Sequence, residues 1–321
     1  MVLDYHDSFS EVSKIKSIKI VDNEVKSASI TFGVPTYKRV NTLRSTLDSI
    51  ISQNGNYAFN IIVSDNNPER DDETERMILS SFANTKGLVY YKHATAMSPA
   101  WNFNKLLELC KTDYLIMVHD DDELLPSFLI EMMTAIHHFP TASIIKCNEV
   151  LWDGKNKPCP QNKNIGFFDI SLESLLFEFK IAPTGCVMRK ADFLEVGGFS
   201  KETLPATDYA LVAQLLLKGK QVLYYNKQLM YYRCCDNDTS NPATQEKLLE
   251  MDKKIKQEIE MHTNIPSWYV RLSIFICTKM HRVVIKKINT KRKSLKDYPF
   301  FMLSHIYSRL STLYFQKKII M

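Results

Sequence analysis

Between residues 29 and 118, short apolar runs alternate with segments in which apolar residues recur every three or four positions. Apolar runs of about four to eight residues predict buried strands, and the longer spacing predicts helices. The runs cover 29–34, 59–64, 87–91 and 114–118, and the helical segments cover 41–52, 72–82 and 101–110. Because strands alternate with helices, we expect an α/β fold with a mostly parallel sheet joined by right-handed crossovers.

The pattern is less regular after Pro126. Residues 152–165 predict a loop, because Gly, Pro, Asn and Lys gather there. The other apolar patterns predict strands over 142–150, 186–189 and 221–225, and helices over 172–179 and 209–217. We therefore divide the chain into an N-terminal lead (1–27), a domain (28–240) with halves of about 28–126 and 127–240, and a tail (241–321).

Polar residues follow three of the predicted strands, at 35–39, 65–67 and 119–122. In open α/β sheets, ligands bind outside the carboxyl ends of the strands. A solvated loop would explain any one of these segments. Three of them at strand ends are better explained by a single binding site.

Three adjacent carboxylates, Asp120, Asp121 and Asp122, come directly after the apolar run YLIMV. Such neighbours repel one another and raise each other's pKa unless a cation lies among them. Carboxylate oxygens suit Mg²⁺ or Mn²⁺, which commonly bridge to substrate phosphates. A solvated acidic turn is the alternative. The position directly after a buried strand favours the metal site.

Five segments resemble motifs of the inverting glycosyltransferase family 2, in the family's order, between residues 29 and 240. They read SITFGVPTYKR, IIVSDNN, NFNKLLELCKTDYLIMVHDDDELLP, IAPTGCVMRKADFLEVGGFSKETLPATDYAL and LMYYRCCDNDTS. The resemblance implies a GT-A-type nucleotide-sugar-binding sandwich, with a donor half (28–126) and an acceptor half (127–240). It also implies transfer of a hexose or N-acetylhexosamine from a UDP-sugar to an acceptor hydroxyl.

By position, the resemblance implies that Asp65 accepts the imide N–H of uracil, which favours uridine over other nucleosides. Asn102, or alternatively Asn104, would help to close the nucleotide pocket. The residues that the resemblance places around the nucleotide sugar are Pro35, Tyr37, Arg39, Asp65, Asn66, Asn102 and Asp120. Packing or helix capping is the alternative role for Tyr37 and Asn102.

The resemblance makes Asp121 the ligand of a Mn²⁺ or Mg²⁺ ion that bridges to the diphosphate, with Asp122 and His119 as further candidate ligands. The chain departs from the family pattern at two positions. His119 stands where many relatives have the first Asp of the DXD motif, and Cys235 stands where the closing segment often has His. The resemblance therefore does not decide whether a third side chain of the protein binds the metal.

Asp208 is the candidate general base. It precedes an apolar helix and follows the segment Gly197-Gly198-Phe199 by about ten residues, as the resemblance requires. An ordinary helix N-cap is the alternative for an Asp at this place. A carboxylate here would take the acceptor proton as the hydroxyl attacks the anomeric carbon, and one such displacement inverts that carbon.

The tail is strongly basic. Residues 268–321 carry twelve Lys and Arg and one acid, Asp297, so they hold +11 of a chain whose net charge is +5. A helix with apolar and cationic faces predicts association with an anionic membrane. The alternative is a helical cap that packs on the domain. Nucleic acid is not expected, because no recognised nucleic-acid-binding module accompanies the charge.

The chain has seven cysteines without zinc-ligand spacing, and no apolar run reaches the ~18 residues that span a bilayer. Its first twenty residues lack the apolar core of a signal peptide. We expect a cytoplasmic protein, peripheral on the inner membrane. A lipid-linked acceptor in O-antigen, capsule or lipopolysaccharide assembly is expected by analogy alone.

Two other functions compete with this interpretation. A sugar nucleotidyltransferase has a Gly-rich phosphate loop after its first strand, and VPTYKR lacks one. A non-catalytic protein that keeps the fold to bind a sugar or a partner stays open.

Overall fold

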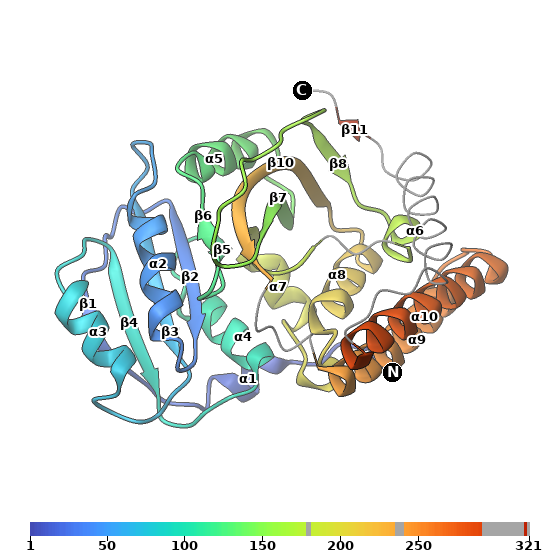
Figure 1. Cartoon of the computed structure of the whole chain (residues 1–321), viewed down its shortest axis with the longest axis horizontal. Coiled ribbons are helices and arrows are strands. Elements are labelled where there is room, and N and C mark those ends of the chain that lie inside the picture. Colours follow the sequence, from blue (N-terminus) through green and yellow to red (C-terminus); the bar gives the residue numbers. More distant parts are fainter. Residues whose placement is uncertain (178–180, 235–240, 291–317, 320–321) are drawn as a thin grey trace.

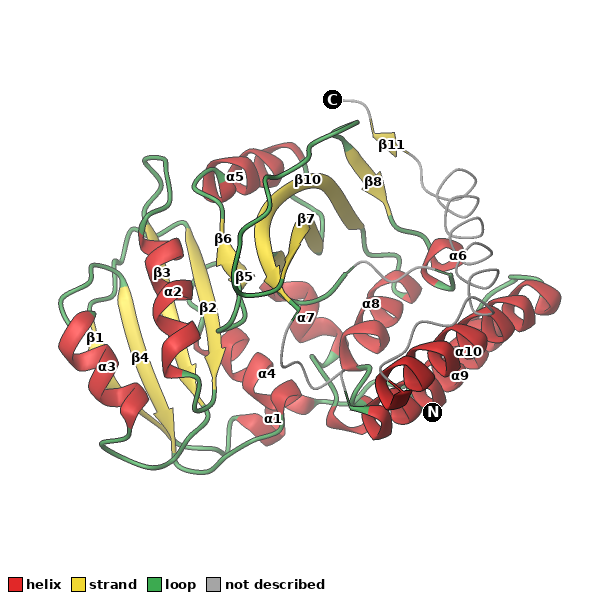
Figure 2. Ribbon diagram, viewed as in Figure 1, coloured by secondary structure: helices red, strands yellow, loops and turns green. Residues whose placement is uncertain are grey.

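The computed structural model describes residues 1–177, 181–234, 241–290 and 318–319. Among these residues, one mixed sheet runs through the molecule, in the strand order β1-β4-β3-β2-β5-β9-β7-β10-β8-β11, and β6 pairs with β10. Helices cover both faces of this sheet, and two long helices lie at one end of the molecule (Figures 1 and 2). The predicted α/β class is confirmed.

The donor half follows the sequence pattern closely. Its parallel strands are β2 (Ile30–Thr36), β3 (Phe59–Asp65), β4 (Leu88–His93) and β5 (Tyr114–Met117). The helices between them are α2 (Val40–Ile51), α3 (Glu73–Ser81) and α4 (Pro99–Leu109). All seven residues of β2 are buried, which explains its continuous apolar run. On α2, Leu43, Leu47 and Ile50 are buried at helical spacing.

Two apolar cores lie on opposite faces of the sheet. Leu47 of α2, Ile78 of α3 and Phe128 of α5 (Phe128–His138) belong to one core. Leu106 of α4 and Leu211 of α8 (Thr207–Leu217) belong to the other. The sheet is therefore the middle layer of an α/β/α sandwich.

The acceptor half is mixed in strand direction. It contains β7 (Ile144–Trp152), β8 (Phe167–Asp169), β9 (Cys186–Arg189) and β10 (Val222–Arg233). The short strands β6 (Glu123–Leu124), at the end of the donor half, and β11 (Lys318–Ile319), in the tail, join the same sheet. Strand β9 runs antiparallel to both β5 and β7, and β10 runs parallel to β7. Besides α5 and α8, its helices are α6 (Leu172–Leu175), α7 (Lys190–Val196) and the 3-10 turn η1 (Lys201–Thr203).

Two elements of this half differ from the expected lengths. Helix α6 ends at Leu175, and residues 178 and 179 of the predicted 172–179 helix lie outside the described residues. Strand β10 is longer than the predicted 221–225, because it continues to Arg233 after a register shift between Tyr225 and Gln228. The polar residues 226–228 interrupt the apolar pattern at that shift, and bulges of this kind are invisible to periodicity.

The N-terminal lead contacts the domain closely. Helix α1 (Ser8–Val12) packs near α4, and β1 (Ser17–Asp22) pairs antiparallel with β4 at the edge of the sheet. Val12 is fully buried. Of the six residues of β1, only Val21 is buried, as is typical of an edge strand.

The described part of the tail forms α9 (Pro242–His262) and α10 (Ser267–Thr290), which lie side by side and against the body (Figure 1). Ile255, Ile259 and Val270 are fully buried in the core that also contains α8. Helices α9 and α10 therefore pack on the domain, while the basic segment 291–317 lies outside the described residues. Among the described helices, none combines the length and apolar character needed to cross a membrane.

Candidate active site

The polar strand ends of the donor half meet at one edge of the sheet. Strand β2 pairs in parallel with both β3 and β5, so Thr36 lies opposite Asp65 and Gly33 lies opposite Met117. The Thr36 hydroxyl donates a 2.7 Å hydrogen bond to the Asp120 carboxylate in the loop after β5. The end of β2 is thereby joined to the acidic loop.

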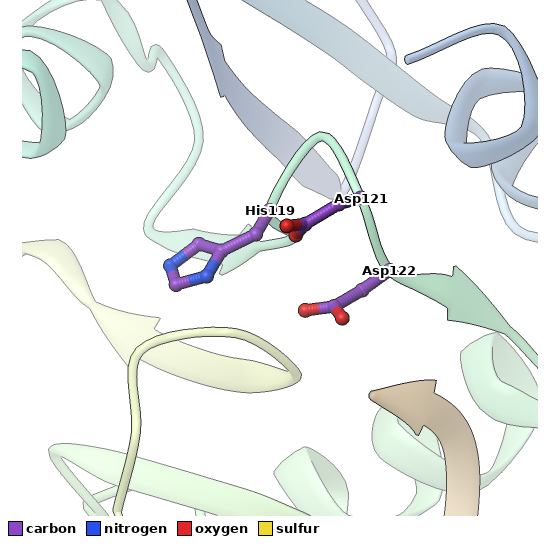
Figure 3. Close-up of side chains that lie close together, drawn as sticks. All are labelled: His119, Asp121 and Asp122. Atoms are coloured by element: carbon purple, nitrogen blue, oxygen red, sulfur yellow. The ribbon is translucent and has the colours of Figure 1, made fainter. Parts of the chain in front are cut away.

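The acidic loop holds a cluster of three candidate metal ligands. His119, Asp121 and Asp122 project their side chains to the same side of the loop (Figure 3). One ligand atom from each lies within 4.8 Å of the others. The sequence predicted Asp121 as the ligand and the other two as further candidates, and the structure brings all three together.

Asp122 is fully buried at the base of this cluster. Its carboxylate accepts a 2.7 Å hydrogen bond from the Thr184 hydroxyl and a 2.9 Å bond from the Arg233 backbone N–H. Burial, together with the charge of Asp121, raises the pKa of Asp122 to about 7. Thr184 lies within the segment IAPTGC that resembles the family, but no pattern in the sequence marks it individually.

The His119 ring stacks on Phe103, with centroids 5.6 Å apart and an interplanar angle of 14°. Burial lowers the pKa of His119 to about 4, so the imidazole is neutral at pH 7, which is the form that binds metals. Its buried Nε2 has no hydrogen-bond partner among the described residues. An orphaned buried nitrogen costs free energy unless a ligand satisfies it.

Arg39 supplies positive charge to the acidic loop. Its guanidinium donates to the Asp121 carboxylate and lies 3.7 Å from that of Asp120. Burial raises the pKa of Asp120 to about 6. The Arg39 side chain is 40% exposed, so it reaches the acids from the solvent side.

The cluster fits a divalent cation. Its donor set is one ring nitrogen of a neutral imidazole and two carboxylate oxygens, a combination suited to Mn²⁺ and to other first-row metals. In the structure, the Asp121 carboxylate pairs with the positively charged guanidinium of Arg39. Cys235, the other position at which the chain departs from the family pattern, lies outside the described residues.

Asp65 lies in a buried network. Its carboxylate accepts from the Tyr90 hydroxyl at 2.7 Å and the Asn67 backbone N–H at 2.9 Å, and Lys92 Nζ lies 3.1 Å away. Burial raises the pKa of Asp65. Lys92 also pairs with Asp72 at 2.8 Å. Among the described residues, Oδ2 contacts Tyr90 and Lys92 and Oδ1 accepts from Asn67, and the Asp65 side chain is fully buried.

The two predicted asparagines hold the backbone around this end of the sheet. Asn66 exchanges two hydrogen bonds with the backbone of Met97, at 2.8 and 2.7 Å. Asn102 accepts from the Ser64 hydroxyl at 2.6 Å and donates to the Ser64 carbonyl. Both side chains are buried and hydrogen-bonded within the chain, so in this structure they hold the backbone that carries the site.

The remaining predicted nucleotide residues are on β2 and in the loop that follows it. Pro35 is buried within β2, next to Thr36. Tyr37 is 49% exposed, and Lys38 Nζ lies 5.6 Å from the centroid of its ring. An exposed aromatic face at a strand end can stack on a nucleobase.

Asp208 is the second residue of α8, whose N-cap is Ala206. Asp208 is therefore not the cap that the alternative interpretation required. Its carboxylate accepts the Tyr209 backbone N–H at 2.8 Å and has no cationic partner among the described residues. Burial raises the pKa of Asp208 to about 6, which suits a general base that works near neutral pH.

Aromatic rings connect Asp208 with the metal cluster. Phe199 lines a small crevice with Asp208 and Pro183, the residue before Thr184. The Phe199 ring packs edge-on against Phe103, at 5.3 Å between centroids, and Phe103 is the ring that stacks on His119. The candidate base and the candidate metal cluster are therefore built on one packed unit.

Asn104, the alternative to Asn102, holds this unit in place. Its side chain makes two 2.8 Å hydrogen bonds to the backbone of Phe199. Gly198 has a φ of 77°, and a Cβ there would lie 2.5 Å from Asn104 Oδ1. The Gly197-Gly198-Phe199 turn needs glycine for this approach.

Arg233 is a further site residue that was not singled out in the sequence, although it belongs to the closing segment LMYYRCCDNDTS. Its Nε donates a 3.0 Å hydrogen bond to the Asp121 carbonyl, and its guanidinium lies 4.2 Å from the ring centroid of Trp152. The extension of β10 beyond its register shift carries Arg233 to the acidic loop.

Comparisons with known proteins identify the family and the fold of the chain. The family model described as "Glycosyl transferase family 2" matches residues 31–197. No curated protein matches the chain by sequence. A solved structure of S. aureus TarS 1–349 in complex with UDP-GlcNAc has a TM-score of 0.61 at 16% identity, covering 88% of this chain and 81% of that one.

A second solved structure is the mannosyltransferase PcManGT from Pyrobaculum calidifontis, in complex with GDP-Man and Mn²⁺. It has a TM-score of 0.58 at 14% identity, covering 95% of this chain and 86% of that one. At these identities the structural likeness shows a shared fold. Because the family model spans more than half of the residues and includes the acidic loop, the chain belongs to glycosyl transferase family 2.

Proposed function

We propose that this glycosyltransferase moves a hexose or N-acetylhexosamine from a UDP-sugar to an acceptor hydroxyl with inversion, in a reaction that depends on Mn²⁺ or Mg²⁺. The observation that carries the proposal is the His119, Asp121 and Asp122 cluster, with its orphaned imidazole nitrogen, at the carboxyl end of β5. Asp121, Asp122 and His119 would hold the ion, which would supply charge that stabilises the departing diphosphate.

Uridine is proposed because Asp65, at the end of β3, stands at the position that the family resemblance gives to the uracil-binding carboxylate. Tyr37 offers an exposed ring face near the same strand ends. The TarS structure with UDP-GlcNAc supports a uridine donor, whereas PcManGT carries GDP-Man. The sugar itself is therefore left to experiment.

Asp208 is the proposed general base. Above a pH of about 6 its carboxylate is mostly ionised and can take the acceptor proton. Arg39 would pair with the phosphates, because its guanidinium already lies beside the acidic loop. Asp120, which accepts a hydrogen bond from Thr36, would lie beside the ribose.

We further propose a lipid-linked acceptor of bacterial surface-polysaccharide assembly, used at the cytoplasmic face of an anionic membrane. The support is the solvent-facing side of α10, where Trp268 and Phe275 are 67% and 56% exposed. They lie about two turns apart on one face, and Arg271 is exposed near them. Vesicles that contain anionic lipid should sediment the enzyme better than neutral vesicles, and the variant W268S/F275S should lose this preference.

The donor is tested with a panel of UDP-sugars and GDP-mannose, measured as release of the nucleotide with and without acceptor extract. We expect turnover with at least one UDP-sugar, loss of turnover in chelator, and recovery when Mn²⁺ or Mg²⁺ is restored. Undiminished turnover in chelator would exclude the metal, and turnover with GDP-mannose alone would exclude uridine.

A further inference from the structure

A cavity of about 300 Å³ lies between the domain and the two tail helices. Residues of α6, α8, α9 and α10 line it, and Asp208 is one of them. This volume is at the small end of the roughly 300–1,000 Å³ found for ligand pockets. The cavity therefore brings the tail helices to the candidate general base.

Most of the cavity wall is apolar. Leu175, Leu176 and Phe177 line it from the α6 segment, Pro205 from the turn before α8, and Leu248 from α9. Leu176 is fully buried, and Leu248 is half-buried. A wall of this kind binds hydrocarbon better than water, because each buried methylene group leaves water at a gain of free energy.

The other polar groups of the wall are bonded to partners within the chain. Lys256 Nζ lies 3.0 Å from the Asp252 carboxylate and 2.8 Å from Cys277 Sγ. The His281 ring lies within hydrogen-bonding distance of the Gln245 amide oxygen, at 3.0 Å. Of the two carboxylates in this wall, that of Asp252 pairs with Lys256, and that of Asp208 has no cationic partner among the described residues.

Asp208 lines this cavity and also the small crevice that contains Pro183 and Phe199. Pro183 of the crevice precedes Thr184, whose hydroxyl donates to Asp122 of the metal cluster, and the cavity lies between Asp208 and the tail helices. A molecule in the cavity can therefore place a polar end beside Asp208 while its remainder stays among apolar side chains.

We infer that this cavity binds a hydrocarbon chain attached to the acceptor sugar, with the acceptor hydroxyl beside Asp208. The inference rests on the proposed transferase function. It adds the place at which the apolar part of the acceptor binds. The tail helices then have a defined role, because Leu248, Cys277 and His281 complete the acceptor site that the domain begins.

The test is calorimetric titration of the full-length enzyme, with UDP and Mn²⁺ present, using n-octyl β-D-glucopyranoside below its micelle concentration. Methyl β-D-glucopyranoside is the matched probe without the chain. We expect the octyl compound to bind at least about tenfold more tightly, which is the change that burial of roughly two methylene groups gives. Equal affinities for the two probes would overturn the inference.

Leu248→Trp should fill part of the cavity and remove this preference. Leu249→Trp is the matched control, because Leu249 is the next residue of α9 and does not belong to the cavity wall. Trp268→Ser tests binding at the exposed side of α10. Loss of octyl binding in Trp268→Ser with full binding in Leu248→Trp would place the chain on the surface and contradict the inference.

Two readouts separate this inference from the proposed function. Unchanged UDP affinity in Leu248→Trp shows that the variant is folded and that the donor site is intact. Wild-type enzyme that turns over a UDP-sugar but shows no octyl preference would refute the cavity assignment alone. Enzyme without any turnover of nucleotide sugar would refute the proposed function.

Discussion

The Thr184 hydroxyl donates a 2.7 Å hydrogen bond to the carboxylate of Asp122. The same oxygen accepts the backbone N–H of His119 at 3.2 Å. One side chain from the acceptor half therefore orients two of the three candidate metal ligands of the donor half. Such outer partners commonly set the geometry of a metal site.

Replacing Thr184 with Val should weaken Mn²⁺ binding by about 10–100-fold, because Asp122 loses its hydroxyl partner while the side-chain volume is nearly kept. Mn²⁺ titration followed by electron paramagnetic resonance measures the change. Thr184→Ser keeps the hydroxyl and should bind Mn²⁺ like the wild type. Equal affinities in Thr184→Val and the wild type would show that this hydrogen bond does not support a metal site.

Replacing Asp121 with Ala should abolish the Mn²⁺-dependent part of UDP binding, because it removes a carboxylate of the candidate metal cluster. The measurement is the Kd for UDP with and without Mn²⁺. Asp153→Ala, in an exposed loop, is the control and should leave both values unchanged. A Mn²⁺ effect that survives in Asp121→Ala would reject Asp121 as a ligand.

Replacing Asp208 with Asn should lower the rate of transfer by about 10²–10⁴-fold, since an amide cannot accept the proton. The UDP affinity should stay within about twofold of the wild-type value, because Asp208 is not among the candidate ligands or nucleotide residues. Transfer at the wild-type rate would remove Asp208 from the role of base. Loss of both transfer and UDP binding would point instead to a damaged fold.

The rate of transfer at saturating donor should rise with pH through a value of about 6 and then level off. Burial raises the pKa of Asp208 to about 6, and only the deprotonated carboxylate acts as a base. Below this pH the rate should fall about tenfold per unit. The UDP affinity, measured over the same range, controls for titration of the donor site. A rate that is flat between pH 5 and pH 7 contradicts the assignment.

The strands and helices of the donor half were predictable because each carries its own local signal. Two examples are the run of buried residues in β2 and the helical spacing of Leu43, Leu47 and Ile50 in α2. Both signals depend on residues that are close together in the sequence. The acidic triplet after β5 could be singled out as a candidate metal site for the same reason, since its charges are adjacent in the chain. Family resemblance then proposed roles that spacing alone does not supply.

Arg233 illustrates what local pattern misses. It reaches the Asp121 carbonyl because β10 continues past a register shift between Tyr225 and Gln228, at which apolar periodicity breaks. The Lys92 network around Asp65 was equally hidden. A buried lysine in a strand is recognisable only once the carboxylates that neutralise it are known.

The chain by itself determined the alternation of strands and helices, the acidic loop and the order of the family motifs, because these depend on residues a few positions apart. Tertiary structure alone decided that Thr184 meets Asp122, that the tail helices pack on the domain, and that they enclose a cavity at Asp208. Each of these contacts joins segments far apart in sequence. Such contacts depend on how whole layers pack, and no local pattern of polar and apolar residues encodes them.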